Sequence, residues 1–388
     1  MKRVVFVFKY DLNWLGGIYY KLHLIRALRN ANALVNIIVY TEKSNLPHVK
    51  ALVEKFDVKV KHYDVEVPRG LGTTELFFRN RLDLSLIGLF DFDLVLSDGV
   101  FDYSSTGILR AAFRRQRIYW IPDLQDIYMP ELFSQDFIEK KKRRYEFIAE
   151  FARHLIFSSY DSRDRFKALF PKVNRSNIII SVLQFCVFHP DIDLKSTSTV
   201  LTKYGLSGQQ YFIVANQFMA HKNHRLVIEA VRLLKDSDKL NFTIVFTGKT
   251  QDPRNINFFN EIRQLIEQYG LVNDIMITGI ISREDQLILM KSALAVIQPS
   301  QFEGWNSSVE DAKLLNVNLI CSDIPVHREQ LTDYPAKFID PHSPDHLAIL
   351  LEEVVTSGWI DESSAINYRI YQEKFSREVE ALFLTASR

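Results

Sequence analysis

Residues 302–313 read FEGWNSSVEDAK and hold three acidic side chains, Glu303, Glu310 and Asp311. The stretch follows an apolar run, LAVIQPS, and its Asn-Ser-Ser sequence marks the start of a helix. Successive residues on a helix point about 100° apart, so Glu310 and Asp311 would face different surroundings. We therefore expect only one of them to share a ligand site with Glu303, which precedes the helix.

The spacing of Ser307 and Glu310 gives one of these acids a structural role. It matches the capping box S-x-x-E, in which the glutamate reaches back to the N–H group of the capping residue. We predict that Glu310 caps the helix through Ser307 and that Asp311 works with Glu303. The simpler interpretation is that all three acids merely favour a helix N-terminus.

A second candidate stretch, ANQFMAHKNHRLVIEA at residues 215–230, also follows an apolar run. Lys222 lies close to the start of a predicted helix, where a cation is unfavourable unless an anion binds there too. We interpret Lys222 as a diphosphate ligand. His221 and His224 are interpreted as polar loop residues, because two histidines without a third ligand make a poor metal site.

Gly16 and Gly17 form a third candidate, between an apolar run at 4–8 and the helical stretch IYYKLHLIRALRN. Glycines at such a turn let backbone N–H groups approach a phosphate closely. The pattern is weak alone, because paired glycines in this place often serve only the turn.

These stretches need a scaffold, and the apolar runs predict one. Solidly apolar runs alternate with helical stretches, which is typical of parallel strands covered on both faces. Repeated βαβ units predict an α/β fold with doubly wound sheets, whose ligands bind beyond the carboxyl ends of the strands. The strands are predicted at residues 4–8, 34–40, 58–65, 93–98, 117–123, 155–159, 177–183, 211–217, 241–249, 274–280, 294–300, 317–323 and 336–340.

The strand pattern pauses between about residues 185 and 210, where HPDIDLKSTST is polar and lacks a helical period. A chain of 388 residues is expected to form two domains. We predict a Rossmann-like domain at 1–188, joined by a C-terminal helix at 370–388, and a second at 189–369. The two domains are expected to face each other across a ligand cleft.

Composition indicates a cytoplasmic protein. The two cysteines, Cys186 and Cys321, lie in apolar surroundings and suit a reducing compartment. The apolar run at the start is too short for a signal peptide, and no run is long enough to span a membrane.

Charge is distributed unevenly along the chain. The first 180 residues hold 29 basic and 21 acidic side chains, and the remainder holds 19 and 26. The basic run Lys140–Arg144 is either a solvated helix face or a surface that docks on an anionic membrane. Nucleic acid is not an expected partner, because no nucleic-acid-binding module accompanies the charge.

The chain resembles the retaining glycosyltransferases of family 4, which have the GT-B fold, over essentially its whole length. The most specific motifs are HKNH before a helix, VFTGK, GIISREDQLILMKSALAVIQPSQFEGWNSSVEDAK and SDIPVHREQ. The first half contributes WLGG, WIPDLQDIYMPELF and SSYDSRDRFKALFP. The acid-x7-acid pair of the family matches Glu303 and Asp311, which leaves Glu310 out of register.

The resemblance implies a role for each matched residue. Glu303 would lie near the transferred sugar and its anomeric carbon, Asp311 would accept hydrogen bonds from the ribose, and Lys222 would neutralise the diphosphate. Further donor contacts would come from Gly16, Gly17, Gly304, Trp305, Asn306, Ser307 and, framing the base, Ile280 and Ile281.

Three positions depart from the family pattern. Gln217 stands where most members have an arginine, so one positive charge near the diphosphate is lost. Asp311 is one methylene shorter than the usual glutamate. Pro122 replaces a common histidine, and Asp123 after it stays a catalytic candidate, although a turn residue is an equal interpretation.

The implied reaction moves a hexose-type sugar from a nucleoside-diphosphate sugar to a glycan, with retention and without a metal or other cofactor. Lys222, helix N-termini and the Gly16-Gly17 turn can stabilise a departing diphosphate. The DFD at 91–93 is interpreted as a loop rather than a metal site.

The acceptor is predicted to be a lipid-linked oligosaccharide in surface polysaccharide synthesis, either O-antigen or capsule. The enzyme would then work at the inner membrane face, with the Lys140–Arg144 run as its contact to the lipid. The alternatives are a nucleotide-sugar-binding protein or an epimerase of the same fold.

Overall fold

The computed structural model describes residues 2–8, 15–63, 94–97, 117–175, 177–188, 196–359 and 366–385. The chain divides into two compact units, residues 1–188 with 369–388 and residues 189–368. The predicted loop at 91–93 lies outside the described residues. No helix of the described ranges is long and apolar enough to cross a membrane.

The first unit is built on a seven-stranded parallel sheet with the order β3-β2-β1-β4-β5-β6-β7. Its strands are β1 (Lys2–Phe8), β2 (Val35–Glu42), β3 (Lys59–Tyr63), β4 (Leu94–Ser97), β5 (Arg117–Ile121), β6 (His154–Phe157) and β7 (Ile179–Val182).

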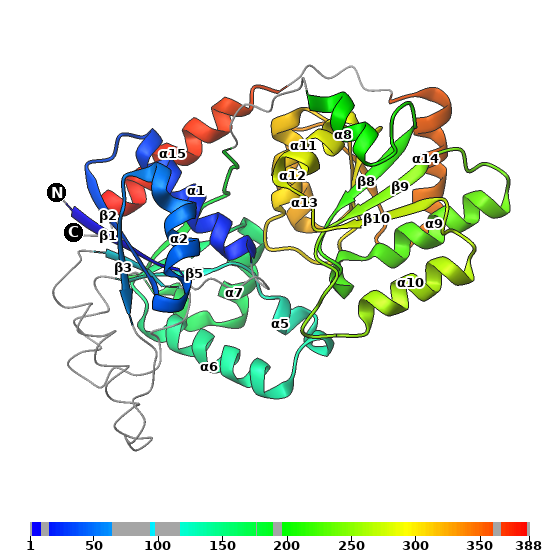
Figure 1. The fold of residues 1–388 in the computed structure, drawn as a ribbon. Coiled ribbons are helices and arrows are strands. Elements are labelled where there is room, and N and C mark those ends of the chain that lie inside the picture. Colours follow the sequence, from blue (N-terminus) through cyan, green and yellow to red (C-terminus); the bar gives the residue numbers. More distant parts are fainter. Residues whose placement is uncertain are drawn as a thin grey trace, which may run out of the picture. The chain divides into compact units, whose positions relative to one another are not determined.

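The helices of this unit connect successive strands, and the last one returns from the C-terminal end of the chain (Figure 1). They are α1 (Leu15–Asn30), η1 (Lys43–Asn45), α2 (Leu46–Val53), η2 (Glu54–Phe56), α5 (Gln125–Tyr128), η3 (Pro130–Leu132), α6 (Gln135–Phe151), α7 (Tyr160–Leu169), η4 (Pro171–Asn174) and α15 (Tyr368–Thr385). Helix α15 packs on β1, where the ring centroids of Phe383 and Phe6 are 5.7 Å apart.

The second unit has a six-stranded parallel sheet with the order β10-β9-β8-β11-β12-β13. Its strands are β8 (Tyr211–Ala215), β9 (Thr243–Thr247), β10 (Ile275–Gly279), β11 (Val296–Gln298), β12 (Leu319–Ser322) and β13 (Lys337–Ile339). In both units the strand order reverses beside the first strand, which is the doubly wound pattern.

Helices cover both faces of the second sheet (Figure 1). They are α8 (Thr197–Lys203), η6 (Ala220–Lys222), α9 (His224–Asp236), α10 (Phe258–Gln268), α11 (Arg283–Ser292), α12 (Ser307–Leu315), α13 (Pro325–Gln330) and α14 (Pro344–Ser357). Helices α9, α10 and α14 lie on one face, and α8, α11 and α12 on the other.

Strand β8 shows why the apolar runs fold this way. Phe212 and Val214 belong to the core on the α9 side, whereas Ile213 and Ala215 belong to the core on the α11 side. Side chains alternate between the faces of a strand, so burial of both faces requires an unbroken apolar run. The predicted fold class is confirmed, and each predicted strand overlaps an observed one.

One prediction about the connection at 185–210 is wrong. We predicted no helix there, but α8 spans Thr197–Lys203. Its local sequence, TSTVLTK, has little helical pattern, and the helix gains its stability from tertiary packing. Val200 and the following Leu206 are buried in the same core as Leu287 of α11.

Gly248 brings two loops into close contact at the carboxyl ends of β8 and β9. Its φ is +136°, and a Cβ atom built on it would lie 2.3 Å from the carbonyl oxygen of Asn216. Just beyond, the N–H of Phe218 donates to the carbonyl oxygen of Lys249 at 2.9 Å. A residue without a side chain is therefore required where the loop after β8 passes the loop after β9.

We predict that Gly248→Ala destabilises the protein much more than Gly270→Ala. Gly270 also has a positive φ, +64°, but open space around its Cβ position. The control should lose about 1 kcal/mol from its backbone conformation alone, and Gly248→Ala about 3 kcal/mol or more from the added clash. Denaturant unfolding measures both, and equal losses would contradict the close packing of the two loops.

Candidate active site

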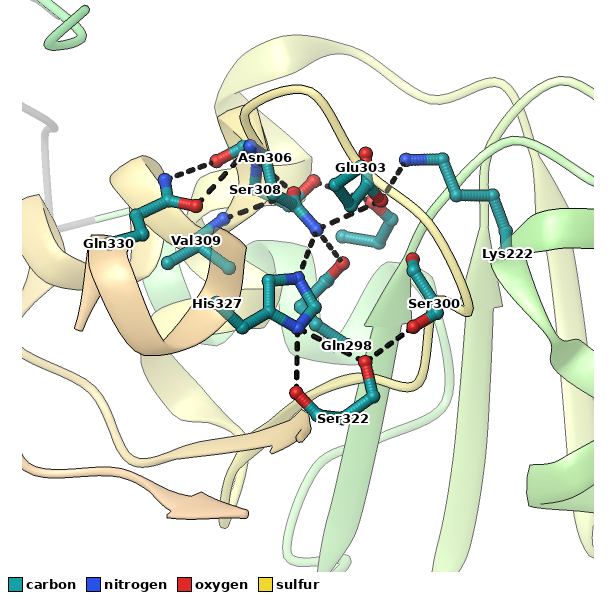
Figure 2. A network of polar contacts seen from close by, with 11 residues as sticks. Lys222, Gln298, Ser300, Glu303, Asn306, Ser308, Val309, Ser322, His327 and Gln330 are labelled. Carbon is teal, nitrogen blue, oxygen red and sulfur yellow. Dashed lines mark hydrogen bonds and ion pairs between the residues drawn. The ribbon is translucent and has the colours of Figure 1, made fainter. Parts of the chain in front are cut away.

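Lys222 and Glu303 form a buried ion pair in the second unit, on loops that follow β8 and β11. Lys222 Nζ lies 2.5 Å from Glu303 Oε1, and the two side chains are only 17% and 8% exposed. The residues are 81 positions apart in the sequence. The structure thus brings together two of the three predicted catalytic residues (Figure 2).

The backbone around Lys222 is fixed by the residues on either side. Asn223 adopts a left-handed conformation, with φ of 57°, and its side-chain amide donates to the carbonyl oxygens of Pro299 and Pro341. The carbonyl oxygen of His221 accepts from the N–H of Gln301 at 2.8 Å. These bonds hold the Lys222 turn against the loop that carries Glu303.

The two histidines of HKNH are buried, so their prediction as polar loop residues is wrong. His224 begins α9 and stacks on Phe218 with ring centroids 4.3 Å apart. Burial, together with the positive charge of Lys222, lowers the pKa of His224 to about 3. Burial also lowers the pKa of His221 well below its usual range, and nearby Lys222 adds to the effect. Both rings are therefore neutral at pH 7.

The N-cap of helix α12 lies one residue earlier than predicted. Asn306, not Ser307, is the N-cap, and its side-chain oxygen accepts from the N–H groups of Ser308 and Val309. The hydroxyl of Ser308 donates to the carbonyl oxygen of Ala215 at 2.7 Å, which ties the start of α12 to the end of β8. Asn and Ser are equally good caps, so a run of them does not fix the boundary.

The predicted capping box is also wrong, because Glu310 does not reach back to the helix start. Its carboxylate accepts from Gln330 at 2.7 Å and from Tyr368 at 2.5 Å, and pairs with Lys313 at 3.3 Å. Glu310 and Lys313 are almost fully buried. The role of Glu310 is structural, as expected, but it stabilises the packing of α12 rather than its N-terminus.

Asp311 points to a different neighbour, as the helix geometry predicts. It is 1% exposed and forms a salt bridge with Arg283, the first residue of α11. Arg283 follows Ile280, which is exposed, and Ile281, which is half-buried. The residues expected on the nucleoside side therefore lie around the start of α11.

Asn306, one of the predicted donor-binding residues, has its backbone N–H and carbonyl groups bonded to the side chain of Gln330. Its N–H donates to Gln330 Oε1 at 3.3 Å, and its carbonyl oxygen accepts from Gln330 Nε2 at 2.8 Å. This N–H would have to leave Gln330 to contact a donor, so the donor contact expected at Asn306 stays a prediction. Gly304, Trp305 and Ser307 lie beside it, and Ser307 is exposed. Gln217 is half-buried in the loop after β8.

The candidate residues of the first unit are Gly16, Gly17 and Asp123. Gly16 and Gly17 lie in the first turn of α1, where Gly16 is exposed and Gly17 buried. Asp123 follows β5, and its Oδ1 accepts from the N–H of Gln125 at 3.0 Å, which is the bonding of a turn residue. Asp126, three residues further along, is buried and accepts from the hydroxyl of Tyr145 at 2.8 Å.

In the part of the chain that the structure describes, no group of three or more His, Cys, Asp and Glu side chains could hold a metal ion.

We predict that Glu310→Gln lowers the free energy of unfolding by about 3 kcal/mol, because it leaves the buried ammonium of Lys313 without its counter-charge. Glu373→Gln is the matched control, since Glu373 pairs with Arg369 on an exposed helix face. That change should cost about 0.5 kcal/mol or less. Denaturant unfolding of both variants measures the difference, and similar values would show that the Glu310 contacts add little.

Comparison with known proteins shows what the chain is similar to. Residues 201–373 match the family model of the glycosyl transferases group 1. The chain is 24% identical over 231 residues to the O-antigen chain mannosyltransferase RfbU of Salmonella typhimurium, and 24% identical over 167 residues to the O-antigen chain mannosyltransferase B of Escherichia coli. These matches cover 58% and 43% of this chain, and 57% and 42% of the relatives, so the chain spans about half the length of the curated relatives it matches.

A solved structure shows the same fold over the whole chain. HepE of Anabaena, in complex with UDP and glucose, is 15% identical with a TM-score of 0.68, covering 100% of this chain and 97% of that one. At this identity the likeness shows the fold. Residues 201–373 thus match the glycosyl transferases group 1, and the fold of the chain is the GT-B fold.

Proposed function

We propose that the protein transfers a hexose-type sugar from a nucleoside-diphosphate sugar to a glycan acceptor, with retention of the anomeric configuration. The observation that carries this proposal is the buried pair of Lys222 and Glu303 beside the N-terminus of α12. A buried carboxylate and ammonium, with a helix start next to them, suit a reaction in which a diphosphate leaves a sugar.

Lys222 is the group that meets the departing diphosphate. An ammonium has three N–H donors, and Glu303 accepts one of them. Negative charge on the phosphate oxygens grows as the bond to the anomeric carbon breaks, and a fixed, mostly buried cation stabilises that charge more than water does. Lys222 thus favours the transition state over the bound sugar nucleotide.

The proposed transfer needs no covalent intermediate with the enzyme. The bond between the anomeric carbon and the phosphate oxygen breaks, and the acceptor hydroxyl oxygen bonds to that carbon on the same face. The proton of the hydroxyl passes to a phosphate oxygen of the leaving group. Glu303, paired with Lys222, orients the sugar through its hydroxyl groups.

Asp311 is proposed to bind the ribose of the donor. A carboxylate has two oxygens and about four acceptor positions, so the salt bridge with Arg283 leaves capacity for hydroxyl groups.

The names of the relatives suggest the substrates. Two are O-antigen chain mannosyltransferases, and the structural neighbour holds UDP and glucose. We therefore propose a mannose- or glucose-type donor and an acceptor in O-antigen or capsule synthesis, carried on a lipid.

We predict that Lys222→Ala lowers kcat/KM for the donor by roughly 100- to 1000-fold, as expected for the loss of one main stabilising group. Lys239→Ala is the control, because Lys239 pairs with Glu352 on the surface of the same unit and should leave kcat/KM unchanged. Released nucleoside diphosphate is measured with and without acceptor, across GDP- and UDP-sugars. NMR of the product gives its anomeric configuration.

Two results would contradict this proposal. Release of nucleoside diphosphate that no glycan acceptor increases would exclude glycan transfer, and a product of inverted configuration would exclude retention. Binding of nucleotide sugars without any release would instead favour a binding protein.

The membrane contact is proposed for a smaller surface than the sequence suggested. Of the run Lys140–Arg144 in α6, Lys141 and Arg144 turn inward, with Lys141 Nζ 3.9 Å from Asp126 and Arg144 buried. Lys140, Lys142 and Arg143 are exposed. We propose that these three cations bind an anionic lipid surface, which would bring a lipid-linked acceptor to the enzyme.

Vesicle flotation tests the three exposed cations together. Replacing Lys140, Lys142 and Arg143 by glutamine should weaken binding to anionic vesicles on the order of 100-fold, at about 1 kcal/mol per charge. The control removes equal charge on the surface of α2, η2 and β3, through glutamine at the exposed residues Lys50, Lys55 and Lys59. Equal loss in both variants would indicate a non-specific charge effect and contradict the proposal.

A further inference from the structure

The side chain of Asn306 has its orientation fixed by the helix that it caps. Its oxygen, Oδ1, accepts from the N–H groups of Ser308 at 3.0 Å and Val309 at 3.4 Å. The amide nitrogen, Nδ2, must therefore point the other way, into the buried polar network below the loop (Figure 2).

Three acceptors surround this nitrogen, which has only two hydrogens. Nδ2 lies 3.0 Å from Gln298 Oε1, 3.2 Å from Glu303 Oε1 and 3.3 Å from His327 Nε2. The same Glu303 oxygen binds Lys222. Asn306 therefore couples the helix cap to the ion pair, and His327 is one of the groups that hold Asn306 in place.

The contacts of His327 fix its protonation state. Its Nδ1 lies 3.0 Å from the carbonyl oxygen of Ser322, which can only accept, so Nδ1 carries the hydrogen. The Ser322 hydroxyl donates to the carbonyl oxygen of Ser300 and presents a lone pair to Nδ1. Nε2 must then accept from Asn306, because a hydrogen on it would face the hydrogens of Nδ2.

Burial supports a neutral ring. His327 is completely buried, and this burial lowers its pKa, with nearby Glu303 acting in the opposite direction and Lys222 in the same one. Helix α13 thus holds Asn306 from two sides, with His327 on the side-chain amide and Gln330 on the backbone.

We propose that His327 is a positioning residue for the transfer reaction, in which its neutral, Nδ1-protonated ring holds the Asn306 amide and through it the carboxylate of Glu303. The inference deepens the function proposed above and rests on it. Without the acceptor at Nε2, Asn306 keeps its capping bonds but loses one anchor of its nitrogen. Glu303 then has a less fixed orientation toward Lys222 and the sugar.

Two substitutions separate the two sides of the ring. In His327→Gln, the side-chain oxygen can replace Nε2 as the acceptor for Asn306. In His327→Asn, the shorter amide can replace the Nδ1 donor to Ser322 but offers Asn306 no acceptor. We expect kcat to fall on the order of 10-fold in His327→Asn, as for one lost hydrogen bond, and less than about 3-fold in His327→Gln. KM for the donor should change little in either.

Thermal unfolding of both variants corrects for the folded fraction. A merely structural role would lower the melting temperature of both and leave kcat per folded molecule equal to that of the wild type, which would overturn the proposal. Wild type and Glu303→Gln are assayed in parallel. Suppose the wild type transfers sugar and Glu303→Gln does not. Rates in both His327 variants equal to the wild-type rate would then refute the positioning role of His327 and leave the proposed function intact.

A spectroscopic measurement tests the geometry without any activity. NMR of the wild-type protein labelled with ¹⁵N-histidine at pH 7 shows which ring nitrogen carries the hydrogen, and the signals missing from His327→Gln identify residue 327. We expect the Nδ1–H form. An Nε2–H form or a charged ring would overturn the inference even if the enzyme proves active, and absence of transfer in the wild type would refute the proposed function instead.

Discussion

The buried ion pair of Lys222 and Glu303 is the constraint on which the second unit's active region depends. An ammonium or carboxylate buried alone costs several kcal/mol, so the two charges must be held together whenever the unit is folded. They come from loops 81 residues apart, and both loops are short extensions of adjacent strands, β8 and β11. The hydrogen bonds of Asn223 to two proline carbonyl groups, and of Ser308 to the end of β8, fix the positions of these loops relative to each other. A parallel sheet places all such loops at one edge, which is why the fold can assemble the pair at all.

The histidines around this pair contribute dipoles rather than charges. His221, His224 and His327 are buried, and burial lowers the pKa of each. If any were charged, its positive charge would compete with Lys222 for Glu303 and loosen the pair. Neutral rings also let His327 accept from Asn306, a bond that a charged ring could not accept. In the proposed reaction, the electrostatic stabilisation of a departing diphosphate would therefore come mainly from Lys222, because Gln217 supplies no charge.

The sequence predicted the strands well and the local hydrogen bonds poorly. The strands of the second sheet are buried on both faces, so their apolar runs are continuous and easily recognised. Glu303 and Lys222 could be found because each follows such a run directly. The cap was misplaced because Asn306 and Ser307 are both good capping residues. The partners of Glu310, at positions 330 and 368, have no signal in the sequence, since they depend on how α13 and the end of the unit pack.

Helix α12 explains why two adjacent acids have such different roles. Asp311 faces α11 and the expected nucleoside side, whereas Glu310 faces α13 and Tyr368, the last residue of the second unit. The C-terminal end of α12 also binds the segment at residues 366–368, because the side chain of Asn316 forms two hydrogen bonds with the backbone of Ile366. One face of the helix thus meets the start of α11, and the other anchors the chain where it leaves the unit. A substitution at Glu310 therefore acts on this anchorage and one at Asp311 on the contact with α11, where the donor site is proposed, although the two residues are neighbours in the sequence.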